Sequence, residues 1–82
     1  MKILAIDHVQ LSMPADQEEQ ARLFYVGLMG FTELPKPPEL LKRGGAWFEQ
    51  GQVKLHLGAE PDFHPLKKAH PALLVDDLES VS

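Results

Sequence analysis

Three histidines, His8, His56 and His70, are the residues of this 82-residue chain whose type and spacing could support chemistry. Neutral imidazoles bind Zn, Fe, Ni and Cu, and also Mn when a carboxylate joins them. Two histidines and one carboxylate leave open positions on the ion, where O₂ and a substrate can bind or a carbonyl can be polarised. A single histidine on a strand is more often a plain polar residue, so this chemistry requires that the three converge.

The first two histidines lie in segments where apolar and polar residues alternate. Residues 4–13 and 53–58 both show this period of two, which is typical of half-buried strands. In both segments the histidine falls on the more polar face. Because neighbouring strands lie about 5 Å apart, His8 and His56 can approach each other across a sheet. His70 begins a third predicted strand, over residues 70–75, whose alternation is too weak to assign a face.

The rest of the chain predicts one helix and two more strands. Asp16, with Glu19 three residues later, predicts a capped helix start, and the apolar spacing extends that helix over residues 16–29. The prolines of residues 35–39 predict an extended loop or edge, which residues 40–43 could continue. The remaining predicted elements are strands at 31–34 and 46–49, a turn at 50–52, a loop at 59–69 and a helix start at 76–79.

The composition restricts the class of protein. The apolar fraction of 44% and the charged fraction of 24% are ordinary for a globular domain, and there is no cysteine to form a disulfide. The net charge is −4 and the basic residues are scattered, which argues against binding to nucleic acid. The sequence has no apolar run near the roughly 20 residues of a membrane span. We therefore expect a cytoplasmic protein that binds neither nucleic acid nor a membrane.

Three local patterns, taken in order, resemble the vicinal oxygen chelate superfamily of glyoxalases, bleomycin-resistance proteins and extradiol dioxygenases. They are Asp7-His8-Val9-Gln10-Leu11, Phe24-Tyr25 followed by Leu28-Met29-Gly30-Phe31, and Ala69-His70-Pro71-Ala72-Leu73-Leu74-Val75-Asp76-Asp77. Met29 stands where the family most often has leucine. Each pattern alone is weak, but the ordered set extends over nearly the whole chain.

This resemblance implies an α+β fold in which two βαβββ modules form a cup around one site. Residues 1–60 then form the first module, 61–69 a linker and 70–82 the start of a second, truncated module. The family's metal ligands lie on the first and last strands of each module. By resemblance, His8, His56 and His70 occupy three of these positions and bind Fe, Mn, Zn or Ni. The fourth position, usually a glutamate, has no counterpart within the sequence.

The strand over residues 46–49 carries the side chains that we expect to contact a substrate. Trp47 and Phe48 are adjacent, so one faces the cup and the other faces the helix. Whichever lines the cup could stack on a flat substrate, and Glu49 could accept a proton. A core position for both rings and a solvated Glu49 are the plainer alternatives.

Three functions remain open from the sequence. The first is a metal-dependent enzyme of dioxygenase or lyase/isomerase type that acts on a small organic molecule. The second is a metal-free protein that binds a small molecule or drug, as bleomycin-resistance proteins do. The third is a truncated product without activity of its own. Both functional alternatives predict a homodimer, because one module leaves an open sheet edge and an exposed apolar face.

Overall fold

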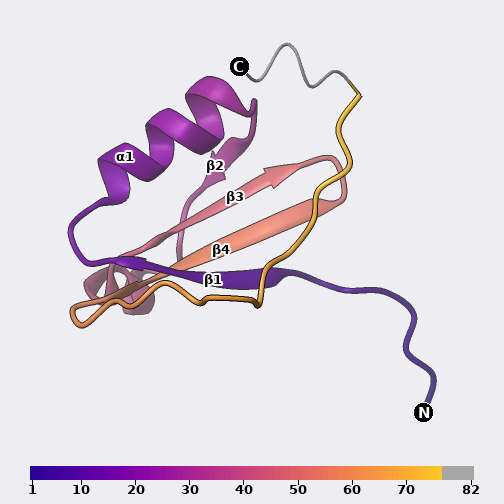
Figure 1. Cartoon of the computed structure of the whole chain (residues 1–82), viewed down its shortest axis with the longest axis horizontal. Coiled ribbons are helices and arrows are strands. Elements are labelled where there is room, and N and C mark those ends of the chain that lie inside the picture. Colours follow the sequence, from indigo (N-terminus) through magenta and orange to yellow (C-terminus); the bar gives the residue numbers. More distant parts are fainter. Residues whose placement is uncertain (77–82) are drawn as a thin grey trace.

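A computed structural model describes residues 1–76 as a four-stranded mixed sheet with one long helix on one of its faces (Figure 1). The elements in chain order are β1 (Val9–Pro14), α1 (Glu18–Arg22), η1 (Leu23–Leu28), β2 (Thr32–Leu34), η2 (Pro38–Arg43), β3 (Ala46–Gln50) and β4 (Val53–Glu60). The π-helical segment η1 continues α1 without a break, and η2 is a 3₁₀ helix. The predicted α+β fold with a βαβββ module is confirmed.

Strand pairing decides which side chains face the helix. The sheet order is β1-β4-β3-β2, with β1 parallel to β4 and the other two pairs antiparallel. The register pairs Phe48 with Leu55 and Trp47 with His56. Because successive residues of a strand face opposite sides, the first pair points to the helix and the second points away from it. We call the side of the sheet opposite α1 the open face.

The core lies between the helix and the sheet. Its buried members are Met13, Phe31, Ala46, Phe48, Leu55 and Leu57. Tyr25 of η1 stacks on Phe48 with ring centroids 5.2 Å apart, which holds the helix against β3. Each large side chain buried here contributes about 1.5–3 kcal/mol, so six residues make a small core.

A close backbone contact holds the end of η2 against β4. A Cβ atom on Gly45 would lie only 2.0 Å from the carbonyl oxygen of Leu57, and the φ angle of Gly45 is 84°. Only glycine fits such a contact at such an angle. The Gly45 amide donates to a carboxylate oxygen of Glu18 at 2.8 Å, and the Lys36 ammonium donates to the Gly44 carbonyl. The η2 segment is therefore tied to both the sheet and α1.

The helix begins differently from the sequence prediction. It starts at Glu18, inside the predicted range of 16–29, and no side chain caps its first turn. Asp16 has a φ angle of 62° and belongs to a turn, so the predicted capping box is wrong. The Ala15 amide donates to the Glu60 carbonyl at 3.2 Å. This bond extends the contact of β1 with β4 past Pro14, so the chain turns toward the helix later than local sequence suggests.

Residues 40–43 are helical in the structure, and their predicted extended conformation is wrong. They belong to η2, whose first residue is Pro38. Proline favours the first position of a helix because its fixed φ angle already matches and its missing amide is not needed there. The Leu40 amide donates to the Pro37 carbonyl at 2.9 Å, which closes the first turn.

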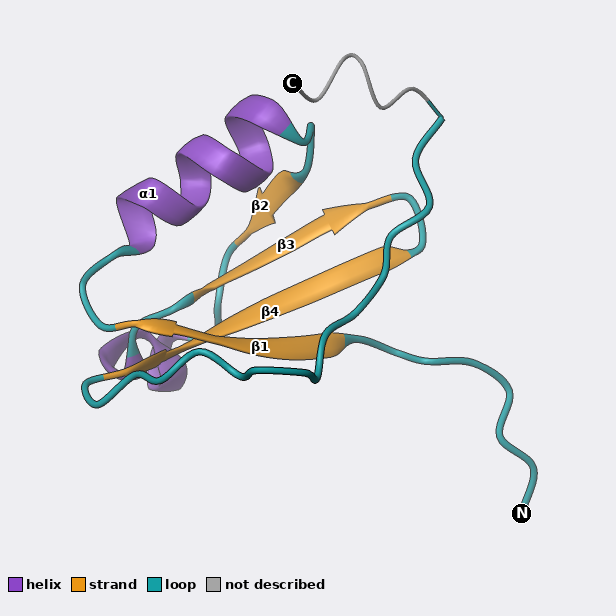
Figure 2. Ribbon diagram, viewed as in Figure 1, coloured by secondary structure: helices purple, strands orange, loops and turns teal. Residues whose placement is uncertain are grey.

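Residues 70–75 form no strand in the part of the chain that the structure describes, so that prediction is wrong. A strand requires a partner, and β1 pairs only with β4 within the described sheet. In Figure 2 the segment that follows β4 passes across the sheet as a loop. The helix start predicted for 76–79 falls almost entirely beyond residue 76 and outside the described residues. None of the described helices is long and apolar enough to cross a membrane.

Candidate functional site

Three aromatic rings stack side by side on the open face. His56 of β4 stacks on Trp47 of β3, with centroids 4.3 Å apart and ring planes at 10°. On its other side His56 stacks on His8, with centroids 4.1 Å apart and planes at 15°. The ring stack, as we call these three residues, therefore extends from β3 across β4 to the residue that immediately precedes β1. His8 occupies its outer end, since β1 is an edge strand.

The ring of His8 is oriented by its neighbour in the sequence. Its Nδ1 atom lies 2.9 Å from a carboxylate oxygen of Asp7. A carboxylate only accepts hydrogen bonds, so this contact places the proton of a neutral ring on Nδ1. The hydrogen bond from His8 is also the largest cause that lowers the pKa of Asp7. The Nε2 lone pair of His8 is thereby left to accept a proton or to bind a ligand.

Burial on the open face lowers the pKa of His56 and so favours its neutral form. Desolvation is the largest cause that lowers its pKa, and the neighbouring charge of His8 lowers it further, while Asp7 opposes the shift. Lys54, two residues away, also lowers the pKa. A neutral ring is suited to the middle of a stack, because both of its faces are covered by other rings.

The described residues do not by themselves fit a metal ion. A metal lies in the plane of each imidazole that binds it, about 2 Å from the nitrogen. The nearly parallel rings of His8 and His56 cannot both point at one ion in this arrangement. Within residues 1–76, no group of three histidine, aspartate or glutamate side chains is placed to hold one. His8 is therefore one oriented donor and not a complete site.

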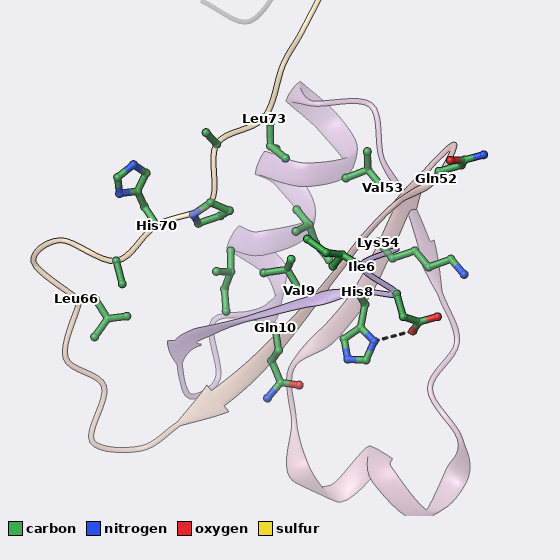
Figure 3. Close-up of a pocket in the computed structure, with 16 residues that line it drawn as sticks. Ile6, His8, Val9, Gln10, Gln52, Val53, Lys54, Leu66, His70 and Leu73 are labelled. Atoms are coloured by element: carbon green, nitrogen blue, oxygen red, sulfur yellow. Dashed lines mark hydrogen bonds and ion pairs between the residues drawn. The ribbon is translucent and has the colours of Figure 1, made fainter. Parts of the chain in front are cut away.

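His70 does not belong to the ring stack, although it lines the same cavity as His8. It belongs to the segment that follows β4, and its Nδ1 atom lies 2.6 Å from the carbonyl oxygen of Lys68. Figure 3 shows the His70 ring pointing away from His8, whereas His8 and Gln10 project from the same side of β1. Sequence reasoning placed His70 on a strand, and without that strand its ring has no fixed direction toward the open face.

The three residues expected to contact a substrate divide between the two faces. Trp47 lies on the open face and is half-buried. Phe48 is completely buried in the core, so it cannot contact a ligand on the open face. Glu49 is half-buried on the open face and is paired in register with Lys54. The alternation of β3 thus decides between Trp47 and Phe48, a choice that the sequence left open.

A second feature of the open face was missed from the sequence. A cleft of about 250 Å³ lies between η2 and the sheet. We call it the Arg43 cleft; its lining includes Gln10, Lys36, Leu40, Arg43, Trp47 and Gly58. The expectation of an extended chain at residues 40–43 concealed it, because only the helical turn of η2 brings Lys36 and Arg43 to one place.

A larger cavity lies elsewhere, along β1 and the segment 66–73 (Figure 3). It measures about 600 Å³ and is lined mainly by apolar side chains, among them Val9, Leu11 and Leu73. His8, Gln10 and His70 also line it, whereas Trp47 and His56 do not. Size alone would make this cavity the ligand site, but two of the three stacked rings, those of Trp47 and His56, lie outside it on the open face. We therefore take the open face as the site and the β1-edge cavity as a surface for association.

The lowered pKa of His56 can be measured by NMR titration of its ring protons. We expect a value below the usual 6.5 or so for histidine. Replacing His8 with Gln should raise it only part of the way, because burial is the larger cause. The unfolded chain binds this proton at higher pH than the folded chain does, so stability should fall as the pH drops below about 6.5. A pKa at or above 6.5 would contradict the described stack.

The chain is similar to the crystal structure of a protein from Bacillus anthracis that is assigned to the glyoxalase family, with a TM-score of 0.88 and 47% sequence identity. The match covers 99% of this chain and 66% of that protein, so this chain spans just under two thirds of its length. No family model and no curated protein matched the chain. Similarity in sequence and structure over nearly all of the chain confirms the predicted resemblance. The chain belongs to the glyoxalase family of the vicinal oxygen chelate superfamily.

Proposed function

We propose that the open face is one wall of a small-molecule site, and that planar ligands bind there against the ring stack. The observation that carries this proposal is the stack itself, which places Trp47, His56 and His8 in parallel on an exposed sheet surface. Aromatic groups are amphipathic and stack with a gain of about 0.5–1.5 kcal/mol beyond simple burial. The outer member of the ring stack, His8, has a side chain that is 41% exposed and can accept another ring.

The groups around the stack would orient such a ligand. Gln10 offers an amide donor and acceptor on one side, and Glu49 a carboxylate on the other. His8 can accept a proton at Nε2 while Asp7 holds its other nitrogen. An aromatic wall with a few directed polar groups is the usual composition of a small-molecule site. This function requires no metal ion.

A metal-dependent enzyme, of dioxygenase or lyase/isomerase type, is the second candidate. The contact between Asp7 and His8 favours it, because histidines that bind metals usually donate their other ring nitrogen to a carboxylate. The other ligands would have to come from a movement of His56 or His70, or from groups outside the described residues. A bound divalent ion would supply a Lewis acid, and His8 would hold it through Nε2.

We also propose that two chains associate along the edge of β1. The outer side of this strand has no partner within the described sheet, and it borders the β1-edge cavity. Three apolar residues before β1, namely Ile3, Leu4 and Ile6, are each more than three quarters exposed. Apolar surface of this kind is usually covered in a stable protein. A second copy would cover it and supply a second module facing the first.

The stacking proposal is tested with 2-naphthamide, a planar and uncharged probe, by isothermal titration calorimetry. Replacing either Trp47 or His8 with Leu should weaken binding roughly 3- to 10-fold, which corresponds to the loss of one aromatic contact. Leu23→Ala is the matched control, because Leu23 is an exposed residue of the helix on the other side of the sheet. If all three variants bind the probe equally well, or the native protein does not bind it, the proposal is wrong.

The metal candidate is tested by elemental analysis after equilibration with Fe(II), Mn(II), Ni(II) or Zn(II) and removal of free ions. A metal-dependent enzyme would bind about one ion per site, with affinity reduced roughly 10- to 100-fold in Asp7→Asn and further in His8→Ala. His64→Ala is the control, since that side chain is 82% exposed in a loop. The candidate fails if none of the four ions binds stoichiometrically, or if His64→Ala has the same effect as His8→Ala.

Association is tested by light scattering of the purified chain. A dimer should show twice the chain mass of 9.2 kDa. Replacing Leu4 and Ile6 together with Glu should shift the protein toward the monomer, because buried carboxylates would oppose each other across the interface. Leu23→Glu, which adds a charge far from β1, should remain dimeric. A native protein that is monomeric at working concentration would refute this arrangement.

A further inference from the structure

The Arg43 cleft carries a charge opposite to that of the protein as a whole. The chain has a net charge of −4, yet the cleft is lined by Lys36 and Arg43 and by no aspartate or glutamate. The Glu18 carboxylate lies beside Gly44 at one end of the cleft, where it accepts from the Gly45 amide and interacts with the charge of Lys36. The uncompensated positive charge of the lining is therefore that of Arg43.

The two positively charged side chains of the cleft, Lys36 and Arg43, differ in the contacts that they already make. The Lys36 ammonium already donates to the Gly44 carbonyl, and its side chain is half-buried. Arg43 is exposed and takes part in none of the ion pairs found within residues 1–76. A guanidinium presents parallel donors that match a carboxylate or phosphate in two hydrogen bonds. Arg43 is thus the group that can clamp an anion, while Lys36 adds a fixed charge beside it.

Gly58 and the side chain of Gln10 form the floor of the cleft. A Cβ atom on Gly58 would lie 3.1 Å from the amide nitrogen of Gln10, so the Gln10 side chain already lies across the floor. Its amide is placed to donate to an oxygen bound there. On the side toward β3, Trp47 lines the same cleft and belongs to the ring stack. The cationic end and the aromatic end of the open face therefore meet at Trp47.

The size of the cleft limits what it can hold. Its volume of about 250 Å³ is below the range of roughly 300–1,000 Å³ typical for sites that enclose a whole drug-sized ligand. It suits a single head group, with the rest of the molecule lying outside. The only aromatic side chain that lines it is Trp47, so a flat remainder would lie toward the ring stack.

From this arrangement we infer that the ligand of the open face is a planar organic anion, whose carboxylate or phosphate binds at Arg43 while its flat part lies against the ring stack. This inference rests on the proposed function and adds the charge of the ligand to it. It also gives Arg43 the role of a specificity-determining residue.

The test compares 2-naphthoate and 2-naphthyl phosphate with the uncharged 2-naphthamide. Trp47 is the single tryptophan, so its indole N–H gives one NMR signal that reports on the cleft directly. Both anions should bind at least 10-fold more tightly than the amide, as expected for a charge-assisted clamp. The better of the two anions identifies the head group.

Matched variants isolate the contribution of Arg43. Arg43→Gln should weaken the binding of the preferred anion roughly 10-fold and leave 2-naphthamide unchanged, while Arg43→Lys should give an intermediate loss. Lys42→Gln removes the same charge from the adjacent residue, which does not line the cleft, and should change binding less than 2-fold.

Each outcome bears on a different proposal. If the amide and the anions bind equally well, or if Arg43→Gln and Lys42→Gln have the same effect, the inference of an anionic ligand is overturned while the ring stack remains a ligand site. If none of the three probes shifts the Trp47 signal, the proposed function fails together with it.

Discussion

The pairing of β3 with β4 is the constraint on which the rest of this structure depends. It places Phe48 opposite Leu55 and Trp47 opposite His56, and so divides the sheet into a core face and an open face. A shift of one residue would exchange these faces, burying an indole and an imidazole under the helix and exposing the core. Both the small hydrophobic core and the candidate site therefore follow from the same few backbone hydrogen bonds.

Much of the fold could be predicted from local patterns, because its strands alternate and its helix has a regular apolar spacing. The positions of His8 and His56 on one face also follow from this alternation. Three features were not predictable in that way. Asp16 fits a capping pattern but lies in a turn held by contacts with β4, and Pro38 starts a helix where several prolines suggested extended chain. The segment 70–75 has the composition of a strand, but composition cannot supply a neighbouring strand to pair with.

Strand alternation also predicted part of the candidate site, namely the face on which the side chains of His8 and His56 lie. Alternation can assign side chains within a strand, but the Arg43 cleft is made by the helical turn of η2, which lies against the sheet. Its shape depends on a close contact between Gly45 and the Leu57 carbonyl, which no pattern in the sequence reveals. The stacking of His8 on His56 was likewise hidden, since convergence on one face does not distinguish rings that point at a common ion from rings that lie flat against each other.

The pairing of β1 with β4 determines when the site forms during folding. Ser12 on β1 donates to Glu60 on β4 across 48 positions of the chain, and the parallel ladder between these strands joins the two ends of the module. Contacts between such distant residues form slowly, because a long stretch of chain must be ordered before they can be made. His8 can meet His56 only after that step, so an emerging or partly folded chain has no ring stack. A ligand that binds the stack would then favour the completed module over its precursors, and its presence during folding would stabilise the product by mass action.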